Sequence, residues 1–171
     1  MRAINYLLFA LIVLLFACQE DYTFIDYRGR FSVEFAEKPS IDVDTFQTAL
    51  GQVELYTFLL ELSTTHAQMI TYSDYPIDKQ YIKDPYAFID GAKEGALESL
   101  NIMQTDFDER IEFMGVPGVE VIGNNSEGLQ IHYKLFLKGN RLYQLGVLTD
   151  GANANVKKGQ DFLESFIFIN N

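Results

Sequence analysis

Apolar and polar residues alternate along two stretches near the C-terminus, and this alternation limits the possible fold more than any other feature. A period of two is typical of a strand that buries one face. Gly139-Asn140 lies between the two stretches, and glycine at the first position of a tight turn can adopt a positive φ. We therefore predict a β-hairpin from residues 129–137 and 141–149. The apolar positions are Leu129, Ile131, Tyr133, Leu135 and Leu137 in the first strand and Tyr143, Leu145 and Val147 in the second.

Similar patterning continues through much of the remaining chain. Phe31, Val33 and Phe35 alternate with polar residues, which predicts a strand over residues 31–35. Residues 53–62 are nearly all apolar, so we expect this strand in the middle of a sheet with both faces covered. The other predicted strands are residues 45–50, 67–74, 110–114 and 119–123.

Two segments change to helical spacing. Residues 86–100 follow Asp84-Pro85, a common helix start, and carry one apolar stripe. Residues 155–166 have apolar residues on one side and charged residues on the other. No repeat or linker divides the chain after Tyr22, so we expect a single domain. One predicted helix interrupts the strands midway, and the other closes the chain. This order predicts an α+β domain, with an antiparallel sheet packed against helices.

The N-terminus has the pattern of an export signal. Arg2 precedes an unbroken apolar run from Tyr6 to Ala17, which is shorter than the about 20 residues that a membrane-spanning helix needs. Cys18, the single cysteine, follows directly. The string Leu15-Phe16-Ala17-Cys18 resembles a bacterial lipoprotein signal, in which the cysteine thiol receives lipid and cleavage occurs just before it. Phe16 is bulkier than the residue usual at its position.

This resemblance implies a signal peptide over residues 1–17, lipid on Cys18 within a tether over residues 18–21, and a domain over residues 22–171. The membrane would then be a partner through the lipid on Cys18, since two acyl chains anchor a protein far better than one. The domain would lie at the bacterial cell envelope, in the periplasm or on the outer surface. The alternatives are a chance cysteine after a plain signal and an uncleaved anchor helix.

The acidic balance of the chain argues against one large class of function. There are 13 Lys and Arg against 24 Asp and Glu, which gives a net charge of −11. Nucleic-acid binding depends on clustered cations that release counterions from phosphates, so we expect no nucleic-acid partner. Electrostatic steering favours a protein partner with a basic surface instead.

We find no motif of a catalytic or metal site. Gly-x-Ser-x-Gly and the glycine-rich phosphate loop are absent. The two histidines, His66 and His132, lie 66 residues apart without zinc-binding spacing. We interpret His132 as an exposed strand residue rather than a catalytic base. We therefore expect no catalytic residue, no cofactor and no metal.

Acidic residues group at three places in the sequence. A calcium loop also needs a central glycine and a bidentate glutamate near its end, and none of the three groups has both. The best divalent-ion candidate is the last group, which we interpret as a solvated acidic turn. The groups are Asp42 with Asp44, Asp74 with Asp78, and Asp106 with Asp108 and Glu109.

Four tyrosines cluster between the strand near Ile70 and the first predicted helix. They are Tyr72, Tyr75, Tyr81 and Tyr86. Tyrosine is amphipathic and enriched at protein interfaces, so we predict a partner-contact surface over residues 72–86. The alternative is that these rings only cover the start of the helix.

Five short sequence strings have an order and spacing that resemble those of a known family. They are GRFSVEF (29–35) followed by Pro39, YSDYP (72–76), GVPGVE (115–120), RLYQL (141–145) and FLESF (162–166). Together they are similar to the PsbP-like superfamily, which also includes the Ran-binding Mog-type proteins; Ala36 stands where many relatives carry Pro. Independently of the resemblance, we interpret residues 115–118 as a turn.

The resemblance implies an α-β-α sandwich with a central antiparallel sheet. Known members bind or stabilise other proteins more than they catalyse, and no catalytic residue carries over. We therefore expect a membrane-anchored, non-catalytic protein-binding or accessory module. The alternatives are a carrier for a small-molecule or lipid ligand, with an aromatic cleft between sheet and helix, and a hydrolase that uses Asp and His.

Overall fold

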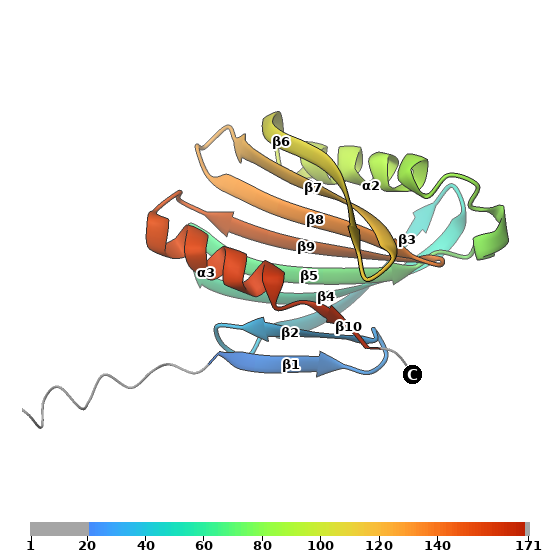
Figure 1. Cartoon of the computed structure of the whole chain (residues 1–171), viewed down its shortest axis with the longest axis horizontal. Coiled ribbons are helices and arrows are strands. Elements are labelled where there is room, and N and C mark those ends of the chain that lie inside the picture. The colour runs from blue at the N-terminus through green and yellow to red at the C-terminus, as the bar shows by residue number, and fades with distance from the viewer. Residues whose placement is uncertain (1–20, 170–171) are drawn as a thin grey trace, which may run out of the picture.

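The computed structural model describes residues 21–169, with a seven-stranded antiparallel sheet at its centre (Figure 1). The strand order is β3-β4-β5-β9-β8-β7-β6. The bounds are β3 (Ser40–Thr48), β4 (Gly51–Ser63), β5 (His66–Asp74), β6 (Ile102–Phe113), β7 (Val116–Asn125), β8 (Gln130–Lys138) and β9 (Arg141–Thr149). The predicted hairpin is confirmed as β8–β9, and Gly139 in its turn has a φ of +69°.

A second sheet, which the sequence patterning did not predict, has three strands in the order β1-β2-β10. Its strands are β1 (Tyr22–Asp26), β2 (Phe31–Phe35) and β10 (Ile167–Phe168). Phe168 of β10 pairs with Phe31 of β2, so the small sheet joins the first and last described strands. It lies beside the large sheet on the side that carries the last helix (Figure 1).

The two helices cover opposite faces of the large sheet. Helix α2 (Pro85–Ser99) follows the short 3-10 helix η1 (Lys79–Tyr81) and packs on β6, β7 and β8. Helix α3 (Asn153–Glu164) packs on β9 and β5 from the other face and also contacts β2. The predicted antiparallel sheet with a helix on each face is therefore confirmed, with the small sheet added to the layer that holds α3.

Helix α2 begins where the sequence predicted. The Asp84 carboxylate accepts hydrogen bonds from the backbone N–H groups of Tyr86 and Ala87, at 3.0 and 3.2 Å. Pro85 occupies the first turn, where a missing N–H costs nothing. The helix packs through Ile89, which is fully buried against Val119, Val121 and Leu135 of the sheet.

Aromatic side chains fill the space between the two sheets and α3. Phe31 is fully buried, and its ring centroid lies 5.5 Å from that of Phe58 and 5.9 Å from that of Phe166. Phe35 packs on Phe162 of α3 at 4.9 Å. Each buried phenylalanine contributes on the order of 1.5–3 kcal/mol from burial. This aromatic core attaches the small sheet to the large one.

The expectation that residues 53–62 are covered on both faces is wrong. Strand β4 is second from the sheet edge, and its burial alternates along the strand. Phe58 and Leu60 are buried on one face, whereas Leu55 and Leu59 on the other face are only half-buried. The reason is that α2 covers β6, β7 and β8 but leaves the same face of β4 open.

Three other boundaries also differ from the prediction. Strand β3 begins at Ser40 rather than at residue 45, and β6 begins at Ile102 rather than at residue 110. Two register shifts near the start of β6 interrupt its period-two pattern. The predicted turn over residues 115–118 is centred earlier, on Met114 and Gly115, which have φ values of +53° and +75°; Pro117 and Gly118 belong to β7.

The predicted signal peptide (residues 1–17) and the lipidation site Cys18 lie outside the described residues. Within residues 21–169, no helix has both the length and the apolar character that crossing a membrane requires.

Candidate functional site

The four tyrosines of the predicted contact surface do not form one patch. Tyr72 is only 1% exposed, and its ring stacks on Tyr56 with centroids 4.7 Å apart. Tyr81, in η1, is 68% exposed. A contact surface that includes Tyr72 is therefore wrong, because the pleat of β5 directs this side chain into the aromatic core.

The other two tyrosines lie against α2 and its neighbours. The Tyr75 ring packs edge-on against Phe88 with centroids 4.8 Å apart. The Tyr86 ring lies 4.6 Å from the guanidinium carbon of Arg110. Both rings are half-buried, which fits the alternative that these tyrosines cover the start of the helix.

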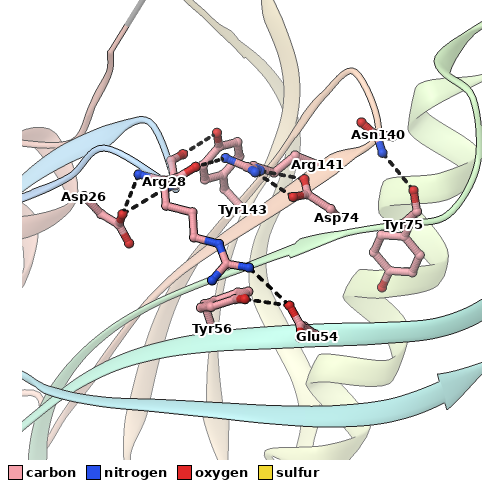
Figure 2. A network of polar contacts seen from close by, with 10 residues as sticks. Asp26, Arg28, Glu54, Tyr56, Asp74, Tyr75, Asn140, Arg141 and Tyr143 are labelled. Atoms are coloured by element: carbon pink, nitrogen blue, oxygen red, sulfur yellow. Dashed lines mark hydrogen bonds and ion pairs between the residues drawn. The ribbon is translucent and has the colours of Figure 1, made fainter.

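A polar network lies at the end of the large sheet where the β8–β9 turn meets the β1–β2 turn (Figure 2). Arg141 donates from Nε and Nη2 to the two carboxylate oxygens of Asp74, at 2.6 Å each. Its Nη1 donates to the backbone oxygen of Arg28 at 2.7 Å, and the Tyr143 hydroxyl donates to the oxygen of Gly29 at 2.7 Å. These bonds tie the small sheet to β5 and β9.

The same network continues toward β4 through Arg28. Its Nη2 donates to Glu54 Oε2 at 3.3 Å, and its guanidinium carbon lies 4.4 Å from the centre of the Tyr56 ring (Figure 2). The Tyr56 hydroxyl donates to the same glutamate oxygen at 2.6 Å, and this bond raises the pKa of Tyr56. Asp26 holds the turn by accepting from the backbone N–H groups of Arg28 and Gly29.

A cavity of about 400 Å³ opens beside this network. Its lining residues are Arg30, Asp74, Lys138, Asn140, Arg141 and Tyr143. Three of these side chains are cationic and one is a carboxylate, in a chain whose net charge is −11. This cluster was not among the predicted sites. A usable signal is present in the sequence, because Lys138 and Arg141 flank the predicted Gly139-Asn140 turn, and Arg28 and Arg30 directly precede the predicted strand over residues 31–35.

The expectation that His132 is exposed is wrong. Its Nε2 lies 2.5 Å from Glu120 Oε1, and Lys134 Nζ lies 3.2 Å from the same oxygen. The group is half-buried because Gln160, Leu163 and Glu164, from α3, border the hollow of about 250 Å³ in which it lies. Burial acts to raise the pKa of Glu120, but the hydrogen bond with His132 and the charge of Lys134 outweigh it and keep that pKa below its ordinary value.

The interpretation of Asp106, Asp108 and Glu109 as an acidic turn is also wrong, because all three lie in β6. Asp106 accepts from Asn124 Nδ2 at 2.7 Å, and Asp108 pairs with Lys93 Nζ at 2.7 Å. Within residues 21–169, no group of three or more His, Cys, Asp or Glu side chains is arranged to hold a metal ion. The remaining carboxylates of the three sequence groups are Asp42 and Asp44 on β3, Asp74 in its pair with Arg141, and Asp78, which caps η1.

The two edges of the large sheet differ in character. The β6 edge carries five charged residues between positions 106 and 112. The β3 edge is exposed at every position except its last, yet Ile41, Val43 and Phe46 are 58%, 46% and 39% exposed. Charged side chains protect an edge from pairing with other strands, whereas exposed apolar residues favour it. Strand β3 is therefore the less protected of the two edges.

The open face beside β4 also carries a small apolar hollow of about 160 Å³. Its lining consists of Leu59, Ala67, Met69, Leu100, Ile131, Tyr133, Gly146, Val147 and Leu148. Pockets that hold a drug-sized ligand have about 300–1,000 Å³. The hollow is thus too small to enclose such a ligand. None of the four predicted tyrosines lines it.

The fold is similar to solved structures. The solution structure of cyanobacterial PsbP (CyanoP) from Synechocystis sp. PCC 6803 matches with a TM-score of 0.52 at 9% sequence identity, over 90% of this chain and 95% of that chain. A protein of unknown function from Pseudomonas aeruginosa gives a TM-score of 0.41 at 11% identity, over 85% of this chain and 92% of that chain. No family model matches the chain, and no curated protein does. The likeness to CyanoP, together with the large antiparallel sheet and its two helices, shows that this chain has the PsbP-like fold.

Proposed function

We propose that the protein is a non-catalytic accessory module that binds a protein partner and is held at the bacterial cell envelope by lipid on Cys18. The main support for a binding role is strand β3, a nine-residue edge strand with three exposed apolar side chains. A protein that worked alone would gain by protecting such an edge, as the charges on β6 do at the other side of the sheet.

The alternation of apolar and acidic side chains along β3 indicates the chemistry of the partner. Ile41 and Val43 lie on one face, and Asp42 and Asp44 lie on the other. A strand added to this edge would place its own side chains opposite both sets. The partner therefore presents apolar residues on one face and Lys or Arg on the other. The net charge of −11 also steers a basic partner toward the protein.

The carrier alternative receives less support. The one hollow described above with a wholly apolar lining has about 160 Å³, and the two larger ones at the sheet end and under α3 have charged linings. A ligand pocket is expected to be larger and mainly apolar. The aromatic rings that the sequence offered for a cleft lie largely in the core instead.

A site-specific photo-crosslinker tests the binding role in intact cells. Placed at Val43, it should give one adduct of constant mass, because β3 meets the partner directly. Placed at Glu98, on the exposed side of α2, it serves as the matched control and should not give that adduct. Identical products from both positions, or no adduct from Val43, would contradict the proposed binding edge.

The anchor is tested separately by metabolic labelling with a fatty-acid analogue. The wild type should be labelled and should fractionate with membranes, and the Cys18→Ala variant should lose both properties. Labelling that survives in the Cys18→Ala variant would show that the lipid is attached elsewhere and would remove Cys18 from the proposal.

A further inference from the structure

The cavity of about 400 Å³ between the β8–β9 turn and the β1–β2 turn is an unusual feature in an acidic protein. Arg30, Lys138 and Arg141 line it, against the single carboxylate of Asp74. We propose that this cavity binds a small organic anion through a phosphate or carboxylate group, with Arg30 and Lys138 as the cationic contacts. Anion binding at this cavity does not depend on strand β3 or on the lipid anchor, whereas the choice of a free anion over a lipid headgroup rests in part on the proposed anchor at Cys18.

Arg141 is present in the lining but is already engaged. Both of its donors toward Asp74 are used at 2.6 Å, and Nη1 is bonded to the oxygen of Arg28. Its role in the cavity is to neutralise Asp74, which would otherwise repel an anion. Arg30 and Lys138 are the other two cationic side chains of the lining.

The backbone of Arg30 supplies a second, independent argument. Arg30 is exposed, and its φ is +57°, a region in which a residue with a side chain is strained by about 1–2 kcal/mol. It is the last residue of the β1–β2 turn, where Gly or Asn would be accommodated more easily. Within residues 21–169, no carboxylate forms an ion pair with its guanidinium. The arginine therefore brings a positive charge to the cavity at the expense of local backbone strain.

Lys138, the last residue of β8, also lines the cavity. Its Nζ lies 4.6 Å from the centre of the Phe168 ring, which helps to fix the position of the ammonium group. Ammonium and guanidinium groups, which both occur in this lining, are the groups that proteins use to bind phosphates and carboxylates. Asn140, from the turn between β8 and β9, adds an amide to the lining.

The size and position of the cavity indicate a free small molecule. A volume of about 400 Å³ exceeds what a single inorganic ion needs and falls within the range for small organic ligands. The cavity lies where β1 ends, whereas the described chain enters at the opposite end of this strand (Figure 1). A protein tethered at its N-terminus would therefore direct the cavity away from its own membrane.

The test is calorimetric titration of the full chain, in a nonionic detergent, with citrate and with inorganic phosphate. The wild type should bind at least one of them saturably. Arg30→Gly should weaken this binding at least about tenfold through the loss of a charge-assisted contact, which corresponds to about 1.4 kcal/mol. The same variant should be folded at least as stably as the wild type, because glycine removes the strain at positive φ.

Met114→Gly is the matched control. Met114 is exposed and has a φ of +53° in the turn between β6 and β7, so its replacement relieves similar strain without changing the cavity. Its binding should equal that of the wild type. Absence of saturable binding by the wild type, or equal affinities for Arg30→Gly and Met114→Gly, would overturn the proposal.

Co-sedimentation with vesicles of anionic phospholipid distinguishes the two sources of phosphate, a free anion and a lipid headgroup. Absence of Arg30-dependent vesicle binding supports a free anion, and its presence would overturn that assignment in favour of a lipid headgroup.

Discussion

Arg141 and Asp74 form a two-point ion pair between the first residue of β9 and the last residue of β5, with both N···O distances at 2.6 Å. The same guanidinium lies 4.8 Å from the centre of the Tyr72 ring and donates to the backbone of Arg28. One side chain thus connects the two sheets at the end where the cavity opens (Figure 2). The geometry is specific to arginine, because lysine cannot donate two parallel bonds from a planar group.

Arg141→Lys should therefore lower the free energy of unfolding by about 1–3 kcal/mol, through loss of the paired bonds to Asp74 and of the bond to Arg28. The measurement is urea denaturation followed by far-UV circular dichroism. Arg110→Lys is the control, because Arg110 meets Asp90 at 3.4 Å on an exposed surface and should change stability by less than about 0.5 kcal/mol. Equal effects of the two replacements would show that the Arg141 geometry is not specific.

The glycines of β7 and α2 should respond to alanine in opposite directions. A Cβ added to Gly118 would lie 2.5 Å from the backbone oxygen of Leu135, so Gly118→Ala should destabilise the protein by about 1–3 kcal/mol. Gly95, inside α2, has open space around it, and Gly95→Ala should stabilise by about 0.5–1 kcal/mol. Thermal denaturation of both variants tests this. A rise in the melting temperature for Gly118→Ala would contradict the observed close approach.

The aromatic core predicts a large effect at its most central ring. Phe31→Ala should cost about 3–5 kcal/mol, because the cavity it leaves lies between both sheets and α3. Tyr27→Ala, in the adjoining turn and 79% exposed, should change stability by less than about 0.5 kcal/mol. Denaturant titration measures both, and a cost for Phe31→Ala as small as that for Tyr27→Ala would mean that the small sheet is only loosely attached.

Protonation of His66 should lower the free energy of unfolding at acidic pH. This side chain is 5% exposed, and its Nε2 has no hydrogen-bond partner within residues 21–169. Burial, and then the positive charge of Lys158, lower the pKa of His66 below the ordinary value of 6.5. The unfolded chain therefore binds a proton at His66 more readily than the folded chain does. The free energy of unfolding has its full value, as far as His66 is concerned, above pH 6.5, and it decreases as the pH falls toward the folded-state pKa of His66.

The check on His66 is the difference in unfolding free energy between pH 7.5 and pH 5.5, which should be smaller in His66→Gln than in the wild type. An unchanged difference would assign the acid sensitivity to other groups. Glu120 is not expected to account for it, because its pKa lies below an ordinary value of 4.5 and its contribution is lost only at lower pH.

The sequence predicted those parts of the fold that depend on local patterning. The β8–β9 hairpin and α2 were found because alternation, a glycine turn and an Asp-Pro start are all local signals. The small sheet was missed because β10 has only two residues and pairs with β2, which is far away in the sequence. The start of β6 was missed because its register shifts break the period of two.

The candidate sites were harder to predict, for a different reason. Tyr72 and Tyr81 are close in sequence, but one lies on the buried side of a strand and the other in an exposed 3-10 turn. Composition alone cannot show this difference. The cations Arg30 and Lys138 come together only through the pairing of distant strands, so neither appears in a local motif.

Two lysine variants test whether β3 is the edge that contacts the partner. Val43→Lys places a charge among the exposed apolar residues of β3, whereas Gln47→Lys places the same charge on the same strand at a position that is already polar and exposed. We predict that the Val43 crosslinking partner no longer co-purifies with Val43→Lys but still co-purifies with Gln47→Lys, with both variants as stable as the wild type. Retention of the partner by Val43→Lys would show that β3 is not the binding edge.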